Sequence, residues 1–215
     1  MNKSNKSERF RAIFWKSPLV LIAIALPGQF LQSTETTGTF AKTSNEFPRG
    51  GSWSLVWSDE FDYQGLPDSS KWTCEQGWKR NNESQYYTVG RLENCRVEDG
   101  MLVIEARREN FATPEGKLAV YTSASLTTKD RAAWKYGRIE VRAKLPRGKG
   151  TWPAIWMLAN RSDTLHWPMC GEIDIMEHVG KEPQNVYATI HYGSKRGEHI
   201  NLNSAVGIGK LGLKS

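Results

Sequence analysis

The sequence has few cysteines and histidines, and neither residue type is spaced for the chemistry that it usually carries. Cys74, Cys95 and Cys170 are an odd number, and none has a plausible partner that would make it a catalytic nucleophile. His191 is not spaced with His178 or Cys170 as the ligands of a zinc site are. The sequence therefore predicts no metal ligands among its site residues.

The pairing of these cysteines is open at this point. Cys74 and Cys95 form either a disulfide bond or two free thiols, and a secreted chain permits both. Cys170 is expected to be a buried free thiol that packs as a small apolar group.

An excess of one charge is also missing once the N-terminal 32 residues are set apart. The whole chain has 29 basic and 23 acidic residues, a net charge of +6. Residues 1–32 hold five of the basic residues and one of the acidic ones, which leaves 24 against 22. A domain this close to neutral gives no electrostatic reason to bind nucleic acid, so no nucleic-acid partner is expected.

No apolar run reaches the roughly 20 residues of a comfortable transmembrane helix. The run Pro18–Leu26 follows a basic segment and fits the apolar part of a secretory signal peptide. The basic segment is long and no A-x-A cleavage site follows, so an uncleaved anchor is the alternative. Residues 1–32 are therefore expected to be a signal peptide or membrane anchor. The protein is expected to be secreted or periplasmic, or membrane-anchored by this segment.

The remaining chain predicts a linker and one all-β domain. Residues 33–51 are rich in Thr, Ser, Gly and Asn, which is typical of a flexible linker, and residues 52–215 form the domain. Asp99-Gly100 between two apolar segments predicts a tight hairpin. Short alternating segments with frequent turns, and no helical periodicity, predict an antiparallel β-sandwich.

Three carboxylates fall within six residues of an apolar stretch, Gly171–His178. Its apolar residues predict a β-strand, in which Glu172 and Asp174 lie on one face. In an unbroken strand Glu177 would point to the other face. One extra residue around Ile175-Met176, inserted as a β-bulge, would return Glu177 to the face of the other two.

This arrangement suits cleavage of a glycosidic bond. A retaining glycosidase needs two carboxyl groups about 5–5.5 Å apart, and the bulge lets Glu172 and Glu177 meet that distance. Asp174 between them would hydrogen-bond the nucleophile and help to keep the acid protonated. The alternative is a solvated strand whose polar face is acidic by chance. The pattern E-x-D-x-x-E in an apolar strand favours the catalytic interpretation.

The run Trp167–Gly180 resembles the active-site strand of glycoside hydrolase family 16, in the bulged form typical of laminarinase-like endo-β-1,3-glucanases. The resemblance extends over about Trp53–Gly193. It implies a jelly-roll, concanavalin A-like antiparallel β-sandwich with an open glycan cleft. By the same resemblance Glu172 is the nucleophile, Asp174 its helper and Glu177 the acid/base.

Two tryptophans are expected to bind sugar. If Trp152–Leu158 is a strand, Trp152 and Trp156 lie on one face and form a stacking platform for a polysaccharide. The alternative is a pair of core tryptophans, which β-sandwiches often contain. The matching family strand lines the subsites that hold sugars before the cleaved bond, and this favours the platform.

Three further residues complete the predicted substrate site. Asn81 lies beside aromatic residues in a segment similar to the family's N-N-E-x-Q-Y-Y, and its amide suits sugar hydroxyls. His191 lies in a strand similar to the family's T-x-H-Y-G and is expected to orient or tune Glu177. Arg138 lies in the alternating segment Gly137–Pro146, whose charged face is otherwise expected to be solvated.

The resemblance implies a monomeric, secreted enzyme that cleaves internal β-1,3 or mixed β-1,3-1,4 linkages of a glucan polysaccharide. The segment after Gly193 resembles none of the family's later strands, so the sandwich is expected to be incomplete at its C-terminus. The family's structural calcium, held near Glu60 and Gly100, would then lack one ligand, and no cofactor is expected. The second hypothesis is a truncated, catalytically inactive glycan-binding relative or a pseudogene product. The three intact carboxylates favour the enzyme.

Overall fold

The computed structural model describes residues 9–15, 53–160, 165–194 and 196–207. The chain divides into two compact units. The first unit comprises residues 1–16, 60–133 and 142–215, and the second comprises residues 17–59 and 134–141. Every strand named below belongs to the first unit.

The described residues form strands and no helices, so the prediction of an all-β fold is confirmed. The strands follow in this order: β1 (Arg9–Trp15), β2 (Thr73–Cys74), β3 (Gln85–Tyr87), β4 (Cys95–Glu98), β5 (Met101–Ala112), β6 (Leu118–Ser123), β7 (Leu126–Thr127), β8 (Ala143–Lys144), β9 (Ala154–Leu158), β10 (Glu172–Glu177), β11 (Asn185–Gly193) and β12 (His199–Gly207). Within these described ranges there is accordingly no helix that could cross a membrane.

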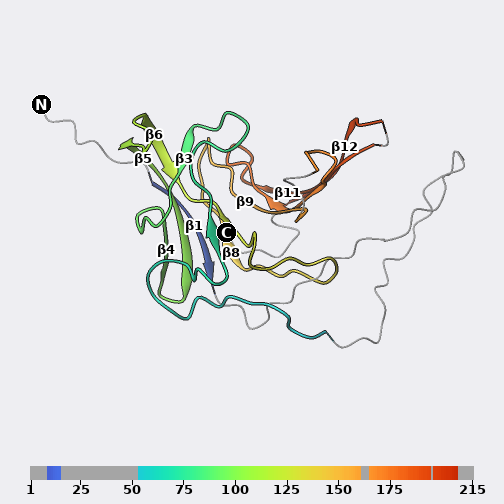
Figure 1. The fold of residues 1–215 in the computed structure, drawn as a ribbon, viewed down its shortest axis with the longest axis horizontal. Coiled ribbons are helices and arrows are strands. Elements are labelled where there is room, and N and C mark those ends of the chain that lie inside the picture. Colours follow the sequence, from blue (N-terminus) through green and yellow to red (C-terminus); the bar gives the residue numbers. More distant parts are fainter. Residues whose placement is uncertain (1–8, 16–52, 161–164, 195, 208–215) are drawn as a thin grey trace, which may run out of the picture. The chain divides into compact units, whose positions relative to one another are not determined.

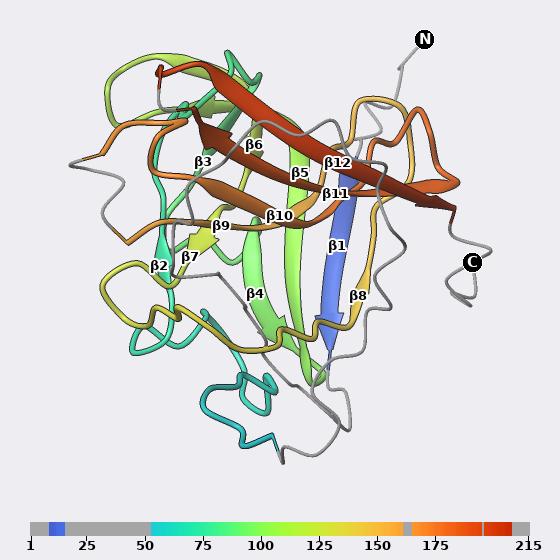
Figure 2. The same cartoon turned by 90° about the vertical axis from the view of Figure 1, so that its right-hand side faces the viewer.

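One sheet has four antiparallel strands in the order β12-β11-β10-β9, which lie side by side in Figure 2 in red to orange. The carboxylate strand β10 is therefore internal, with β9 on one side and β11 on the other. β11 pairs with β12 over nine residues, from Asn185 opposite Gly207 to Gly193 opposite His199. β12 was not predicted from the sequence, because the segment after Gly193 resembles none of the family's later strands.

The larger sheet is organised around β5, a strand of 12 residues. Its strand order is β3-β6-β5-β1-β8, and β4 also pairs with β5 (Figure 1). β4 and β5 form the predicted hairpin, with Asp99 and Gly100 at φ of 54° and 72°, as a two-residue turn of this kind requires. The pairing of β3 with β6 is parallel, which departs from a purely antiparallel arrangement.

The N-terminal segment differs from its prediction in seven residues. Arg9–Trp15 was expected to be part of a signal peptide or anchor, but it forms β1 and pairs with both β5 and β8. Its sequence RFRAIFW contains aromatic and β-branched residues that favour a strand, and pairing with two partners satisfies backbone groups on both of its sides. The rest of residues 1–32, and the predicted linker at residues 33–51, lie outside the described residues.

The predicted strand Gly137–Pro146 forms only in part, since Ala143–Lys144 alone becomes a named strand. The segment crosses from the second unit into the first between Val141 and Arg142. A strand needs a neighbour along its whole length to satisfy its backbone groups, and β8 pairs with β1 at two positions only.

A small apolar cluster, Phe61, Cys95, Val97, Leu102 and Ala124, forms the buried core under the β4-β5 hairpin. All three cysteines are free thiols in the structure. Burial raises the pKa of Cys95 to about 12, so this thiol is unreactive at neutral pH. Cys170 is only partly buried, so the expectation of a fully buried thiol is wrong.

A buried ion-pair cluster lies on the same hairpin. Glu105 of β5 is 1 % exposed and accepts hydrogen bonds from Arg96 at 3.3 Å and from Arg107 at 3.0 Å. Arg96 also binds the more exposed Glu98 at 2.8 Å. A buried carboxylate is tolerated because two guanidinium groups replace its water.

Candidate active site

The predicted bulge in the carboxylate strand is confirmed by the pairing on both of its sides. Asp174 pairs with Thr189 and Glu177 pairs with Tyr187, so an advance of three residues in β10 corresponds to an advance of two residues in β11. The register against β9 shifts at the same place. An extra residue in β10 reverses the alternation of its side chains beyond that point.

The bulge gives the three carboxylates a common face. Glu172 lies opposite Leu158 of β9 and Glu177 lies opposite Ala154, so five steps in β10 match four in β9. Residues four apart in a strand point to one side, and Asp174 is two residues from Glu172 on that side. Glu172 and Glu177 are partly exposed, whereas Asp174 is 4 % exposed.

Each outer glutamate accepts a hydrogen bond from an exposed indole. Trp152, just before β9, donates Nε1–H to Oε1 of Glu177 at 2.9 Å. Trp167, in the turn before β10, donates Nε1–H to Oε2 of Glu172 at 2.7 Å. The rings are 66 % and 49 % exposed. An indole beside each carboxylate holds that carboxylate in place and offers a ring face on which a sugar can stack.

Asp174 is the most strongly perturbed acid of this face. Burial, and then the charges of Glu172 and Glu177, raises the pKa of Asp174 to about 7. A hydrogen bond shared with Glu172 acts in the same direction. Asp174 therefore carries a proton at mildly acidic pH, which it can donate to the neighbouring carboxylate.

As pH rises from about 4 to about 7, the stability of Asp174→Asn relative to that of the native protein is expected to increase. The folded pKa lies above the value of 3.8 for an unperturbed group, so the folded state holds a proton that the unfolded state releases. This lowers the stability of the native protein as pH rises through that window, and Asn removes the effect. The thermal midpoints of both proteins, measured from pH 4 to 8, should separate across the window. Parallel curves would contradict the expectation.

His191 contacts Asp174, whereas it was expected from the sequence to orient Glu177. It lies opposite Glu172, and its Nε2 is 3.2 Å from Oδ2 of Asp174. Glu177 pairs with Tyr187 instead, which lies four residues from His191 along β11. The expectation that His191 orients Glu177 is therefore wrong, because the strand register places His191 opposite Glu172, at the other end of the carboxylate run, where its ring reaches Asp174.

Trp156 also lies on the carboxylate face, directly opposite Asp174. The guanidinium carbon of Arg80 lies 5.0 Å from the centre of its ring. Arg80 is held by Glu75 through two contacts of 2.5 and 2.7 Å. The stacking surface at this position is thus shared between an indole and a fixed cation.

The other two predicted substrate residues are Asn81 and Arg138. Asn81 is exposed with a left-handed φ of 55°, and the contact with Trp156 comes from its neighbour Arg80. Arg138 belongs to the second unit, where it forms an ion pair with Glu140. Sequence reasoning missed Arg80, because a lone arginine in a polar loop is usually solvated.

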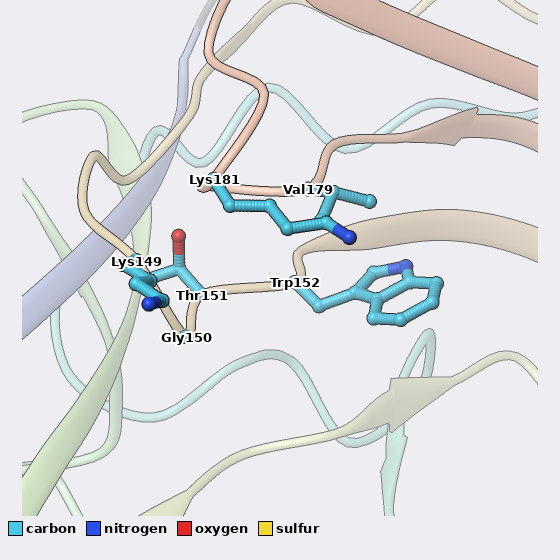
Figure 3. A pocket seen from close by; sticks show the side chains of 6 residues that line it. All are labelled: Lys149, Gly150, Thr151, Trp152, Val179 and Lys181. Carbon is cyan, nitrogen blue, oxygen red and sulfur yellow. The ribbon is translucent and has the colours of Figure 1, made fainter.

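Trp152 also borders a hollow of about 300 Å³ between two loops of the first unit. Figure 3 shows the Lys181 and Trp152 side chains extending in the same direction on one side of this hollow. Its lining residues are Lys149, Gly150, Thr151, Trp152, Val179 and Lys181. The loops meet at Gly180, where a Cβ would lie 2.0 Å from the carbonyl oxygen of Gly148. Only glycine at position 180 lets the two loops come this close, and Trp152 belongs to one of these loops.

Trp152→Ala is expected to lower kcat/KM on a β-glucan by about tenfold, since an exposed ring and an N–H donor are both lost. Trp152→Phe is the matched variant, because it keeps a ring and removes only the bond to Glu177. The thermal midpoint should change little in both. A large fall in the midpoint would show that Trp152 is a core residue.

Glu172, Asp174 and His191 are also the residues that could hold a metal ion among those described, with ligand atoms within 4.8 Å of one another. The structural calcium that the resemblance implies, with one ligand lacking, concerns a different region, near Glu60 and Gly100. Glu60 leaves Oε2 buried without a hydrogen-bond partner, as a cation ligand would. No group of three or more histidine, cysteine or carboxylate side chains gathers around Glu60 in the described part of the chain.

Comparison with known proteins places this site in a family. Residues 82–207 match the model of the family "Glycosyl hydrolases family 16". A beta-glucanase from Rhodothermus marinus is 52 % identical over 165 residues, which cover 71 % of this chain and 56 % of that protein. The chain belongs to glycosyl hydrolases family 16.

Two further comparisons agree with this assignment. A glucan endo-1,3-beta-glucosidase from Cryptopygus antarcticus is 46 % identical over 147 residues, covering 67 % of this chain and 53 % of that protein. The crystal structure of the laminarinase from Rhodothermus marinus aligns with a TM-score of 0.65 at 49 % identity, covering 73 % of this chain and 62 % of that one. The predicted jelly-roll sandwich is thereby confirmed. The chain spans little more than half the length of the two relatives.

Proposed function

We propose that this protein hydrolyses internal β-1,3 linkages of glucans, or mixed β-1,3-1,4 linkages, with retention of anomeric configuration. The observation that carries the proposal is the bulged register of β10, which puts Glu172, Asp174 and Glu177 on one face. The names of the relatives, a beta-glucanase and a glucan endo-1,3-beta-glucosidase, support the substrate class.

In the first step the carboxylate of Glu172 attacks the anomeric carbon, and Glu177 gives its proton to the departing glycosidic oxygen. The sugar is then held as an ester of Glu172. In the second step Glu177 removes a proton from water, the water attacks the anomeric carbon, and Glu172 leaves as a carboxylate.

The remaining residues of the face position these groups. Asp174, with its pKa raised to about 7, donates a hydrogen bond to Glu172 and stabilises this carboxylate as it departs. Trp167 and Trp152 fix the rotation of the two glutamates through their indole N–H groups. Trp156 and Arg80 offer a stacking surface beside them.

The competing proposal is a protein that binds glucan without cleaving it. Binding alone does not require two glutamates that are each held by an indole hydrogen bond, nor an aspartic acid between them whose pKa is raised. These contacts favour turnover over binding alone.

Laminarin is expected to yield the β-anomer as its first product, because two inversions at one carbon restore the starting configuration. Proton NMR of the reducing ends in the first minutes of the reaction measures this before mutarotation. An initial α-anomer would contradict the double displacement. Cleavage of a galactan such as agarose in place of β-glucan would contradict the proposed substrate.

We place the protein outside the cytoplasm, since its polymeric substrate is found there and a basic segment precedes the apolar run Pro18–Leu26. N-terminal sequencing of the product recovered outside the cell tests this. Retention of Arg9–Trp15, the segment that forms β1, would favour an uncleaved anchor over a cleaved signal.

A further inference from the structure

Two histidines from neighbouring strands meet on the carboxylate face. His191 of β11 lies opposite Asn201, and His199 of β12 lies opposite Gly193, so the two are diagonal neighbours on one side of the sheet. Their rings are stacked with centres 5.1 Å apart. Nδ1 of His191 and Nε2 of His199 are 2.9 Å apart, the length of a hydrogen bond.

The other nitrogen of His191 faces a buried oxygen that needs a donor. Oδ2 of Asp174 is buried and has no completed hydrogen bond, and Nε2 of His191 lies 3.2 Å from it. A buried acceptor without a donor costs free energy, and a small rotation of the imidazole would complete the bond. This bond can form only if the proton of His191 is on Nε2.

A neutral imidazole carries one N–H, so a proton on Nε2 leaves Nδ1 of His191 as an acceptor. Its partner at 2.9 Å must then donate. We propose that His199 is a positioning residue of this active site, which donates Nε2–H to Nδ1 of His191 and holds His191 in the tautomer that donates to Asp174. The inference rests on the proposed function for its catalytic consequence, but the tautomer itself does not depend on it.

Trp167 connects this histidine pair to the second carboxylate. Its ring lies 4.5 Å from the ring of His199, centre to centre, and its indole N–H binds Glu172. The chain of donors therefore runs from His199 through His191 to Asp174, which shares a hydrogen bond with Glu172. With Oδ2 satisfied by His191, the carboxyl proton of Asp174 remains available for Glu172.

Three variants of the full chain distinguish the effect of the His199 N–H donor from the effect of its aromatic ring. His199→Phe keeps an aromatic ring against Trp167 and removes the N–H, and His199→Leu removes both. His199→Gln restores an amide N–H at about the position of Nε2. His199 is exposed on β12, so all three variants are expected to fold, which far-UV circular dichroism and the thermal midpoint check.

The deciding measurement is the tautomer of His191, read from its ¹⁵N shifts at about pH 8, above the ordinary histidine pKa of about 6.5. The native protein and His199→Gln should show the proton on Nε2. His199→Phe and His199→Leu should shift the ring toward the Nδ1–H form. A native His191 with its proton on Nδ1, or a tautomer unchanged in both variants that lack the donor, overturns the proposal.

The kinetic measurement tests the consequence. His199→Phe should lower kcat on laminarin about tenfold with KM within about twofold, and His199→Gln should recover most of that loss. If the native protein cleaves no glucan, the proposed function fails while the ¹⁵N result still decides the role of His199. If the native protein is active and the tautomer does not respond to His199→Phe, the role of His199 fails alone.

Discussion

Glu172→Ala is expected to lower kcat on laminarin by ~10⁴-fold or more, because no other group on this face can form the glycosyl ester. Asp174 is buried and carries a raised pKa, so it cannot replace a partly exposed carboxylate that reaches the sugar. Initial rates from reducing-end release, with the thermal midpoint measured alongside, provide the test. The midpoint should stay close to that of the native protein.

Azide distinguishes the two glutamates. With an aryl β-glucan oligosaccharide, Glu172→Ala and azide should give the α-glycosyl azide by a single displacement. Glu177→Ala should give the β-glycosyl azide, because its glycosyl ester still forms. Glu93→Ala is the control, since Glu93 lies away from β10 with its side chain 54 % exposed. Native-like turnover by Glu172→Ala would refute its assignment as nucleophile.

Glu105→Ala is expected to lower the free energy of unfolding by about 3–5 kcal/mol, because Arg96 and Arg107 would lose their shared buried acceptor. Folded domains are stable by only about 5–15 kcal/mol, so this change removes a large part of the margin. Urea denaturation followed by tryptophan fluorescence measures the loss.

Glu98→Ala is the matched control for that experiment. Glu98 binds the same Arg96 but its side chain is 37 % exposed, so its removal should cost less than about 1 kcal/mol. Equal losses for the two variants would mean that the burial of Glu105 does not decide the effect.

The sequence by itself determined the carboxylate strand and its bulge, because both are local. Glu172, Asp174 and Glu177 lie within six residues, and the period of a strand requires one extra residue for all three to lie on one face. The Asp99-Gly100 hairpin was predictable for the same reason, since few dipeptides accept the left-handed backbone of its turn.

Only the tertiary structure decided which side chains surround these carboxylates. Trp167, Arg80 and His199 reach the face from a turn, a loop and an unpredicted strand. Trp167 lies only five residues before Glu172 and could have been suspected. Arg80 and His199 showed no such signal, because the contact of Arg80 with Trp156 arises from packing and that of His199 with His191 from the pairing of β11 with β12.

The strands β1 and β12 have the same explanation. β1 was assigned to a signal peptide or anchor, and the segment of β12 was not recognised as a strand of the family. Each is a strand because a neighbour, β5 or β11, offers backbone groups along its whole length. Likewise, the bulge could be predicted from β10 alone, but the position of His191 beside Asp174 could not. Which residue of β11 faces which carboxylate depends on the register between two strands, and register is fixed by contacts across the sheet.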